Sequence, residues 1–320
     1  MDNFHRGPGF PDGAQLVRIG GPLSHSQEES PMSRLMSLLL LVLFVGCQPQ
    51  TTATSEKSAA SEPIGIGHSL QFSSSVLSQQ RTLNIYLPAS YHQQTQKYPL
   101  LVLLDGGLHE DFHHITGIAQ WAALTGSYQE VIVVGIANID RKHDLTSPSD
   151  NELDKKELPT HGGAAKFRTF ISEELLPWLQ QQYRISDRRL LLGESLAGLF
   201  TTETFLLQPE MFTDYIAISP SLWWNDMKLS LDAKRHLQNG DYANRRLWLA
   251  MADEGGDMRT GYQHLINALK AMPASTLHWQ VTPFADEKHN TIYHPAATKA
   301  VRDLLALQGT GHPAAVTTAN

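Results

Sequence analysis

The chain has 320 residues, 41% of them hydrophobic, and a formal net charge of -7. This length and apolar content are enough for one large globular domain with a full core. A mildly acidic chain without a lysine and arginine block is not expected to bind nucleic acid. The single cysteine, Cys47, excludes an intramolecular disulfide and a cysteine-based zinc site.

An apolar run at 35–46 comes directly before Cys47. It is too short to cross a hydrocarbon core of about 30 Å, but it has the length of a signal-peptide core. The run resembles the leader of bacterial lipoproteins, in which the cysteine is lipidated. We therefore expect a signal peptide at 32–46 and lipidation of Cys47, with the protein anchored in the bacterial envelope, facing the periplasm and held by the outer membrane. The alternative is that Cys47 is a buried thiol in an apolar helix.

The other segments near the two ends of the chain have compositions that do not predict a packed core. Residues 1–31 have no apolar periodicity, so we expect an upstream or disordered segment, with translation starting at Met1 or at Met32. Residues 47–63 are rich in Thr, Ser, Ala and Gln and predict a flexible tether. Residues 309–320 are expected to be a disordered tail, which leaves 64–308 as one folded domain.

The elements of this domain can be predicted in chain order. Two alternating runs, 68–75 and 81–87, predict a β-hairpin. Continuous apolar runs that predict buried parallel strands lie at 98–104, 131–137, 189–192, 215–219, 247–252 and 277–281. Amphipathic helices are predicted at 167–183, 196–207, 258–272 and 298–307. The pattern predicts a three-layer α/β fold with a mostly parallel sheet opened by an antiparallel hairpin.

Ser195 lies where ligands bind in such folds, at the carboxyl end of a strand. The stretch from Gly193 to Gly198 reads GESLAG. It follows the nucleophile-elbow pattern G-x-S-x-G except at Ala197, where a methyl group replaces a glycine. The alternative is a serine that only caps the following helix.

A serine hydroxyl needs a base to become a nucleophile near neutral pH. In α/β-hydrolases the acid and then the histidine follow the serine in the chain. His289 lies in a polar loop after the last predicted strand, so we predict that it is the base. The other histidines after Ser195 fall in predicted helices, a strand or the tail: His236, His264, His278, His294 and His312.

The carboxylate that orients the histidine is expected after the strand 247–252. Three acidic residues lie there, and we predict Glu254, with Asp257 and then Asp253 as alternatives. The oxyanion donors are predicted to be the backbone N–H groups of Leu196 and Gly107.

A metal site is not predicted. His109, His113 and His114 lie close together in the sequence, but no second cluster has ligand spacing. No cofactor is expected either.

Several stretches together resemble the esterase family of α/β-hydrolases that includes esterase D-like enzymes, enterobactin-type siderophore esterases and feruloyl esterases. The resemblance covers about 66–307 and rests on 98–106, 138–146, 167–183, 193–200 and 219–224. It implies that Ser195 is the nucleophile and His289 the base. Members often have glycine at the position of Ala197 and histidine, arginine or glutamine at that of Glu194.

Three further residues are candidates for substrate binding. Arg141 is a cation expected in the pocket, where it could meet an anionic substrate. Trp223 and Trp224 follow a strand end and either form an aromatic wall or pack beneath the rim.

The leading functional hypothesis is a serine carboxylic-ester hydrolase that acts on a small ester through an acyl-enzyme. One alternative is a periplasmic siderophore trilactone esterase. An alternative of another class is a binding lipoprotein that keeps the fold and lacks the chemistry. The oligomeric state is open.

Overall fold

The computed structural model describes residues 62–273 and 277–307. The predicted leader at 32–46, Cys47, nearly all of the tether and the tail at 309–320 lie outside the described residues, so they stay predictions. Within the described ranges, no helix combines the length and the apolar character needed to cross a bilayer.

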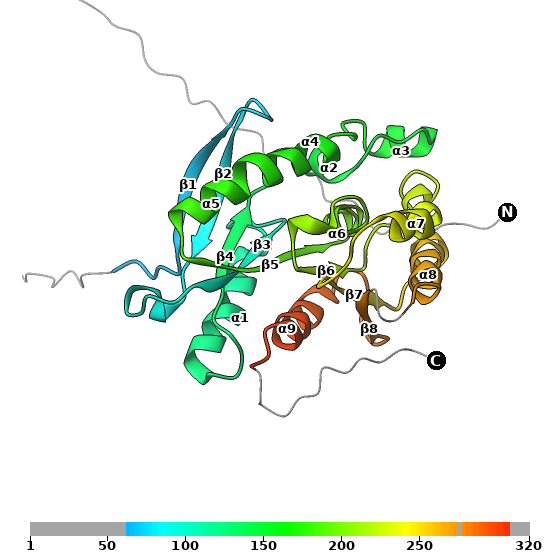
Figure 1. The fold of residues 1–320 in the computed structure, drawn as a ribbon. Helices are drawn as coiled ribbons and strands as arrows, with labels where there is room; N and C mark the ends of the chain where they lie inside the picture. The colour runs from blue at the N-terminus through cyan, green and yellow to red at the C-terminus, as the bar shows by residue number, and fades with distance from the viewer. Residues whose placement is uncertain (1–61, 274–276, 308–320) are drawn as a thin grey trace, which may run out of the picture. The chain divides into compact units, whose positions relative to one another are not determined.

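One sheet of eight strands forms the centre of the described part of the chain (Figure 1). The strands are β1 (His68–Ser74), β2 (Gln79–Tyr86), β3 (Tyr98–Leu103), β4 (Ile132–Ile136), β5 (Ile185–Glu194), β6 (Asp214–Ile218), β7 (Arg246–Ala252) and β8 (His278–Phe284). Their order is β1-β2-β4-β3-β5-β6-β7-β8. The first two pairs in this order are antiparallel and the others are parallel. The predicted parallel sheet with an antiparallel hairpin is therefore confirmed.

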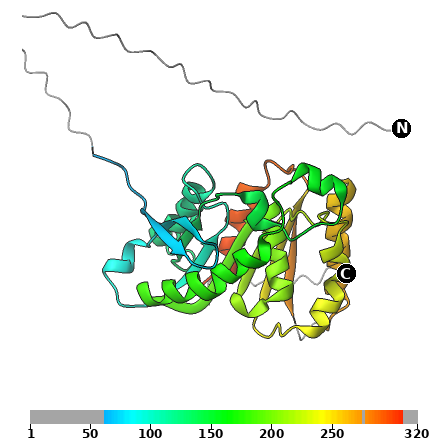
Figure 2. The same cartoon turned by 90° about the horizontal axis from the view of Figure 1, so that it is seen from above.

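Helices cover both faces of this sheet (Figures 1 and 2). The helices on one face are α1 (Phe112–Thr125) and α9 (Tyr293–Leu304). The other face is covered by α4 (Ala164–Thr169), η2 (Phe170–Leu175), α5 (Leu176–Gln182), α6 (Leu196–Leu207), α7 (Lys228–Asn239) and α8 (Gly256–Lys270). Two short helices, α2 (Arg141–Leu145) and α3 (Glu152–Glu157), follow β4, and single 3-10 turns are η1 (Ala89–His92) and η3 (Pro209–Met211). The three layers predicted from the sequence are thus present.

The strands are buried on both faces because their side chains alternate between two apolar cores. Leu100 and Val102 of β3 belong to the core under α6, whereas Leu101 and Leu103 belong to the core under α1 and α9. This explains why the strands read as continuous apolar runs in the sequence.

Several element boundaries differ from the predictions; helix α9, for example, begins at Tyr293 rather than at 298. Strand β5 begins at Ile185 rather than at 189. Its first residues are mostly polar and so lack the apolar signal, and one of them, Arg188, pairs with Asp214 of β6 at 3.2 Å. The predicted helix 167–183 is part of a longer helical stretch that begins at Ala164 and contains a wider turn at Phe170–Leu175.

Buried ion pairs fix the segment that follows β4. Arg81 Nη1 of β2 lies 2.7 Å from Asp144 Oδ2 of α2, and these side chains are 1% and 3% exposed. Arg168 and Glu203 form a second pair at 2.9 Å, and Ser147 Oγ donates to Glu203 at 2.6 Å. Because α2 begins at Arg141, these pairs also hold that residue in place.

We expect Arg81→Leu to lower the free energy of unfolding by about 3–5 kcal/mol, because the Asp144 carboxylate stays buried without its counter-ion. Urea unfolding followed by fluorescence measures the change. The matched control is Arg235→Leu, which removes an exposed pair with Asp232 and should cost at most about 1 kcal/mol. Equal losses in the two variants would show that the buried pair does not hold this segment.

Candidate active site

Ser195 occupies a strained turn between β5 and α6. Its backbone has φ 57° and ψ -116°, outside the regions that non-glycine residues favour. Hydrogen bonds hold this geometry: the Ser195 N–H donates to the Ile218 carbonyl at 3.0 Å, and its carbonyl accepts from Ser221 N–H at 3.0 Å. Its side chain makes no capping bond to α6, so the serine does not act as a helix cap.

The two glycines that flank the turn allow α6 to approach β5 and β6 closely. A Cβ on Gly193 would lie 2.4 Å from the Ala197 carbonyl oxygen, and a Cβ on Gly198 would lie 2.9 Å from that of Ile218. Ala197 itself is fully buried, and its methyl group is accommodated. The alanine in the GESLAG stretch therefore leaves the turn intact.

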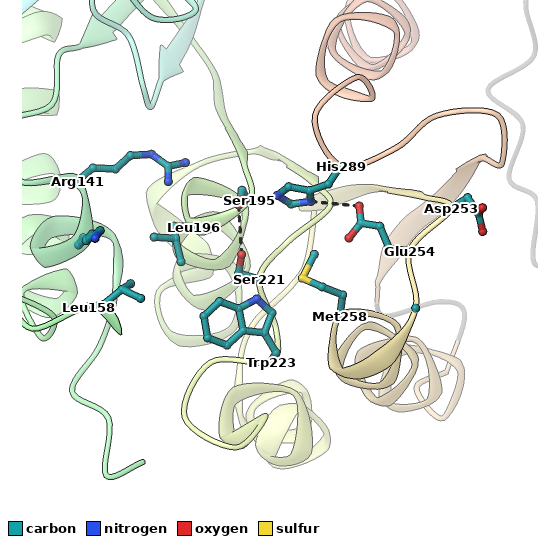
Figure 3. A pocket seen from close by; sticks show the side chains of 12 residues that line it. Arg141, Leu158, Ser195, Leu196, Ser221, Trp223, Asp253, Glu254, Met258 and His289 are labelled. Carbon is teal, nitrogen blue, oxygen red and sulfur yellow. Dashed lines mark hydrogen bonds and ion pairs between the residues drawn. The ribbon is translucent and has the colours of Figure 1, made fainter. Parts of the chain in front are cut away.

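A chain of hydrogen bonds runs from Ser195 through His289 to Glu254 (Figure 3). Ser195 Oγ lies 3.0 Å from His289 Nε2, and His289 Nδ1 lies 3.2 Å from Glu254 Oε1. The three residues follow β5, β8 and β7, so the parallel sheet brings their loops to one edge. Glu254 Oε1 also accepts a hydrogen bond from Ser219 Oγ at 2.6 Å, and the Glu254 side chain is only 8% exposed.

The two alternative carboxylates lie elsewhere. Asp253 is exposed and pairs with Lys288 at 2.6 Å. Asp257 is exposed in the first turn of α8. Of the three candidates, Glu254 is the one that contacts the histidine.

The other candidate histidines within the described residues form no hydrogen bond with Ser195, whose histidine partner there is His289. They lie in α7, α8, β8 and α9, as His236, His264, His278 and His294, whereas His312 is outside the described residues. His114 stacks on His294 with ring centroids 3.7 Å apart. The described residues contain no group of three or more His, Cys, Asp or Glu side chains that could hold a metal ion.

The charge state of His289 depends on its neighbours. Its hydrogen bond with Glu254 raises the pKa of the imidazole, and the negative charges of Glu194 and Glu254 act in the same direction. Burial and the positive charge of Arg141 oppose this rise without cancelling it. Because a general base must be neutral, the raised pKa places the loss of base function at a higher pH than for a free histidine.

One of the two predicted oxyanion donors is available. The N–H of Leu196 is in the first turn of α6, where no helical acceptor exists, and Leu196 lines the cavity beside Ser195. The N–H of Gly107, however, donates to Glu110 Oε2 at 2.6 Å, and Gly107 does not line this cavity. The structure therefore contradicts the predicted role of Gly107, because a carboxylate three residues later already takes its hydrogen bond.

Arg141 provides a cation at the site. Its Nε and Nη2 donate to the two oxygens of Asp105 at 2.7 and 2.8 Å, and Nη2 also reaches the Glu194 carbonyl at 3.3 Å. Asn138 Nδ2 also donates to Asp105 Oδ1, at 2.6 Å. The guanidinium points toward Ser195 in Figure 3, and among the described residues its Nη1 has no hydrogen-bond partner. Nη1 is thus a donor left for a substrate.

The cavity beside Ser195 has a volume of about 590 Å³. Its wall combines Arg141 and Lys142 with the apolar side chains of Leu158, Trp223 and Met258. The structure separates the two predicted tryptophans. Trp223 lines the cavity.

Trp224 packs in the core instead. It is 4% exposed, its Nε1 donates to the Ser147 carbonyl at 2.9 Å, and its ring meets that of His161 edge on. Of the two placements left open by the sequence, Trp224 has the second, packed beneath the rim, and it does not line the cavity. Sequence reasoning also missed Lys142, Leu158 and Met258, although Lys142 belongs to the 138–146 stretch that carries the family resemblance.

Glu194 faces His289 from the side opposite to Glu254. Its Oε1 lies 3.6 Å from His289 Nε2, and its side chain is 18% exposed. Burial raises the pKa of this carboxyl to about 7, although the charges of His289 and Arg141 lower it. The carboxyl thus changes charge near neutral pH.

Comparisons with known proteins find similarity to esterases. The model of the family described as "Putative esterase" matches residues 74–301. The chain is 35% identical over 144 residues to the ferri-bacillibactin esterase BesA of Bacillus subtilis, covering 40% of this chain and 49% of that protein. It is 37% identical over 106 residues to the siderophore enterobactin esterase of Emericella nidulans, covering 30% and 35%. The aligned parts thus span half or less of these two relatives.

Solved structures share the fold. The IroE-like serine hydrolase from Shewanella oneidensis has a TM-score of 0.66 at 25% identity, over 75% of this chain and 80% of that one. The enterobactin esterase FES from Shigella flexneri has a TM-score of 0.60 at 20% identity, over 76% and 59%. The described domain has the α/β-hydrolase fold of these esterases.

Proposed function

Since the chain belongs to the "Putative esterase" family, whose model covers most of its folded domain, we propose that it is a serine ester hydrolase that cleaves the ester bonds of a siderophore. The observation that carries this proposal is the hydrogen-bonded chain from Ser195 through His289 to Glu254 in the wall of a cavity. The names of the relatives, a ferri-bacillibactin esterase and a siderophore enterobactin esterase, favour a siderophore over a small simple ester.

The first half of the reaction forms an acyl-enzyme. Ser195 Oγ attacks the ester carbonyl carbon while His289 Nε2 takes the hydroxyl proton. Glu254 accepts a hydrogen bond from His289 Nδ1–H, which fixes the ring and stabilises its cationic form. The C–O bond to the alcohol then breaks, and the leaving oxygen receives the proton from Nε2.

The second half returns the enzyme to its starting state. A water molecule gives a proton to His289 Nε2 and attacks the acyl carbon. Nε2 then gives the proton back to Ser195 Oγ as the acid leaves. The same histidine therefore serves as base and acid in each half.

The negative oxygen that forms in each half needs donors. The Leu196 N–H supplies one. Because Gly107 N–H is bonded to Glu110, we assign the second to the guanidinium of Arg141, whose Nη1 is free of other partners in the described structure. Its bidentate bond to Asp105 orients the guanidinium before the substrate binds.

The cavity wall also supports a bulky substrate. Trp223 offers a flat apolar face, and Lys142 in the same cavity wall offers a positive charge. An aromatic ring that carries hydroxyl groups or negative charge would meet both.

We expect the purified protein to cleave a cyclic trilactone siderophore with a kcat/KM at least about 100-fold above that for p-nitrophenyl butyrate, because remote contacts lower the barrier only for the larger substrate. Chromatography of the linear trimer, dimer and monomer measures the reaction. Trp223→Ala should reduce this preference, whereas Trp121→Ala, which changes an exposed tryptophan of α1, should leave it unchanged.

Two results would contradict the proposal in different ways. If p-nitrophenyl butyrate reacts faster than the trilactone siderophore, the protein is an esterase, but its substrate is not a siderophore. Tight binding of the siderophore with no products would identify a binding protein that keeps the fold without the chemistry.

A further inference from the structure

We propose that Glu194 is a positioning residue for His289: its ionised carboxylate attracts the imidazolium from the side of Nε2 and so determines the pH at which the base becomes neutral. This inference rests on the proposed function, because it concerns the same histidine. It adds a carboxylate that the serine, histidine and acid mechanism does not use.

The geometry places His289 between two carboxylates. Glu254 Oε1 lies 3.2 Å from Nδ1, and Glu194 Oε1 lies 3.6 Å from Nε2. In the resting enzyme Ser195 Oγ occupies the hydrogen-bond position at Nε2, at 3.0 Å. Glu194 therefore acts on the histidine through charge, and its effect is largest when Nε2 is protonated.

The position of Glu194 is fixed by the elbow. It is the last residue of β5 and pairs with Ile218 of β6, while its carbonyl accepts a hydrogen bond from Arg141. Its side chain is largely buried, so solvent screens the charge poorly. The strand pairing and the carbonyl contact thus fix the backbone of Glu194, and from there its side chain reaches the Nε2 side of His289.

Charged and titratable groups face Glu194 from each neighbouring element. The groups are His289 in the loop before α9, Arg141 in α2, Asp105 and Asp111 between β3 and α1, and Tyr293 in α9. Besides His289, the charged groups are two acids, Asp105 and Asp111, and the cation Arg141. Arg141 is already paired with Asp105, so these neighbours do not neutralise Glu194 fully. The Tyr293 hydroxyl is buried and has no hydrogen-bond partner among the described residues.

The two groups therefore titrate as a coupled pair. Burial raises the pKa of Glu194 to about 7, and the pKa of His289 is raised mainly by its bond to Glu254 and also by Glu194. As pH falls, both groups take up protons, and protonation of Glu194 removes the negative charge that attracts the imidazolium. The wild-type activity should decline over a broad pH range, as expected for two interacting sites.

The test is Glu194→Gln in the full chain, with rates of Ser195 labelling by a fluorophosphonate probe and kcat/KM for p-nitrophenyl butyrate measured from pH 5.5 to 9. Without the carboxylate, the imidazole loses its proton more easily, so the acid limb should move to lower pH and become steeper. We expect the ratio of the rate at pH 6.5 to that at pH 8.5 to rise about threefold or more. Asp257→Asn removes the same charge from an exposed position in α8 and should keep the wild-type profile.

A wild-type pH profile in Glu194→Gln would overturn the inference, as would a uniform loss of rate at every pH. Glu194→Asp keeps a carboxylate and should restore a profile between the two. If Glu194→Gln does not fold, as judged by thermal melting, Glu194→Asp takes its place, and a profile equal to that of the wild type then counts against the inference.

The failure of the proposed function gives a different result. If neither the probe nor the ester reacts with the wild type, the hydrolase proposal fails. The NMR titration of the His289 ring still tests the inference, because His289 should titrate at lower pH in Glu194→Gln than in the wild type, and equal titration would contradict it.

Discussion

Replacing Ser195 by alanine is expected to lower kcat for ester hydrolysis by about 10⁴-fold to 10⁶-fold, because no other group can form the acyl-enzyme. The fold should be unchanged, since alanine keeps the Cβ of the elbow and the serine hydroxyl makes no capping bond. Stopped assays with a chromogenic ester and thermal melting measure the two quantities.

Ser221 provides the matched control for this variant. Its hydroxyl lies 3.3 Å from Ser195 Oγ, yet no described histidine contacts it. Ser221→Ala should therefore retain activity within about tenfold of the wild type. A large loss in Ser221→Ala together with an active Ser195→Ala would show that Ser221, and not Ser195, is the nucleophile.

Replacing Glu254 by glutamine is expected to lower kcat by about 10³-fold to 10⁴-fold, because an amide can donate to Nδ1 and stabilise the wrong tautomer of His289. The comparison set is Asp253→Asn and Asp257→Asn, whose carboxylates do not contact the histidine and whose variants should stay within a few fold of the wild type. These variants together decide which carboxylate after β7 is the acid. A larger loss in either aspartate variant than in Glu254→Gln would show that the resting geometry is not the working one.

The elbow and the sheet could be predicted because they depend on local patterns. Strands buried on both faces read as apolar runs, and the G-x-S signal sits at the end of one of them. The order of Ser195, Glu254 and His289 along the chain follows from the α/β-hydrolase connectivity, so sequence reasoning reached all three before their distances were known. Sequence reasoning preferred Glu254 but left Asp257 and Asp253 open, because three carboxylates in one turn differ only in where their side chains point, which the contact with His289 shows.

Contacts between distant segments could not be predicted. The bidentate bond between Arg141 and Asp105 joins residues 36 positions apart, and nothing in either segment indicates the other. The hydrogen bond from Gly107 to Glu110 is local, but only the folded loop shows that it occupies the N–H predicted to bind the oxyanion. Trp223 and Trp224 are neighbours in the chain and point to different environments, which a sequence pattern cannot separate.

The short helices after β4 also escaped prediction. Helices α2 and α3 are too short to show an amphipathic period, and buried ion pairs contribute to holding this segment. The segment nevertheless places Arg141, Lys142 and Leu158 in the cavity wall. Part of the wall of the proposed substrate cavity is therefore formed by a segment with little secondary-structure signal.

The most direct test of the account is the site of covalent labelling by a fluorophosphonate, mapped by mass spectrometry of the intact protein and of its peptides. The account predicts one adduct per chain, on Ser195, and no adduct in His289→Ala within the time that labels the wild type. Labelling of another residue, or no labelling of a folded wild-type protein, would contradict it.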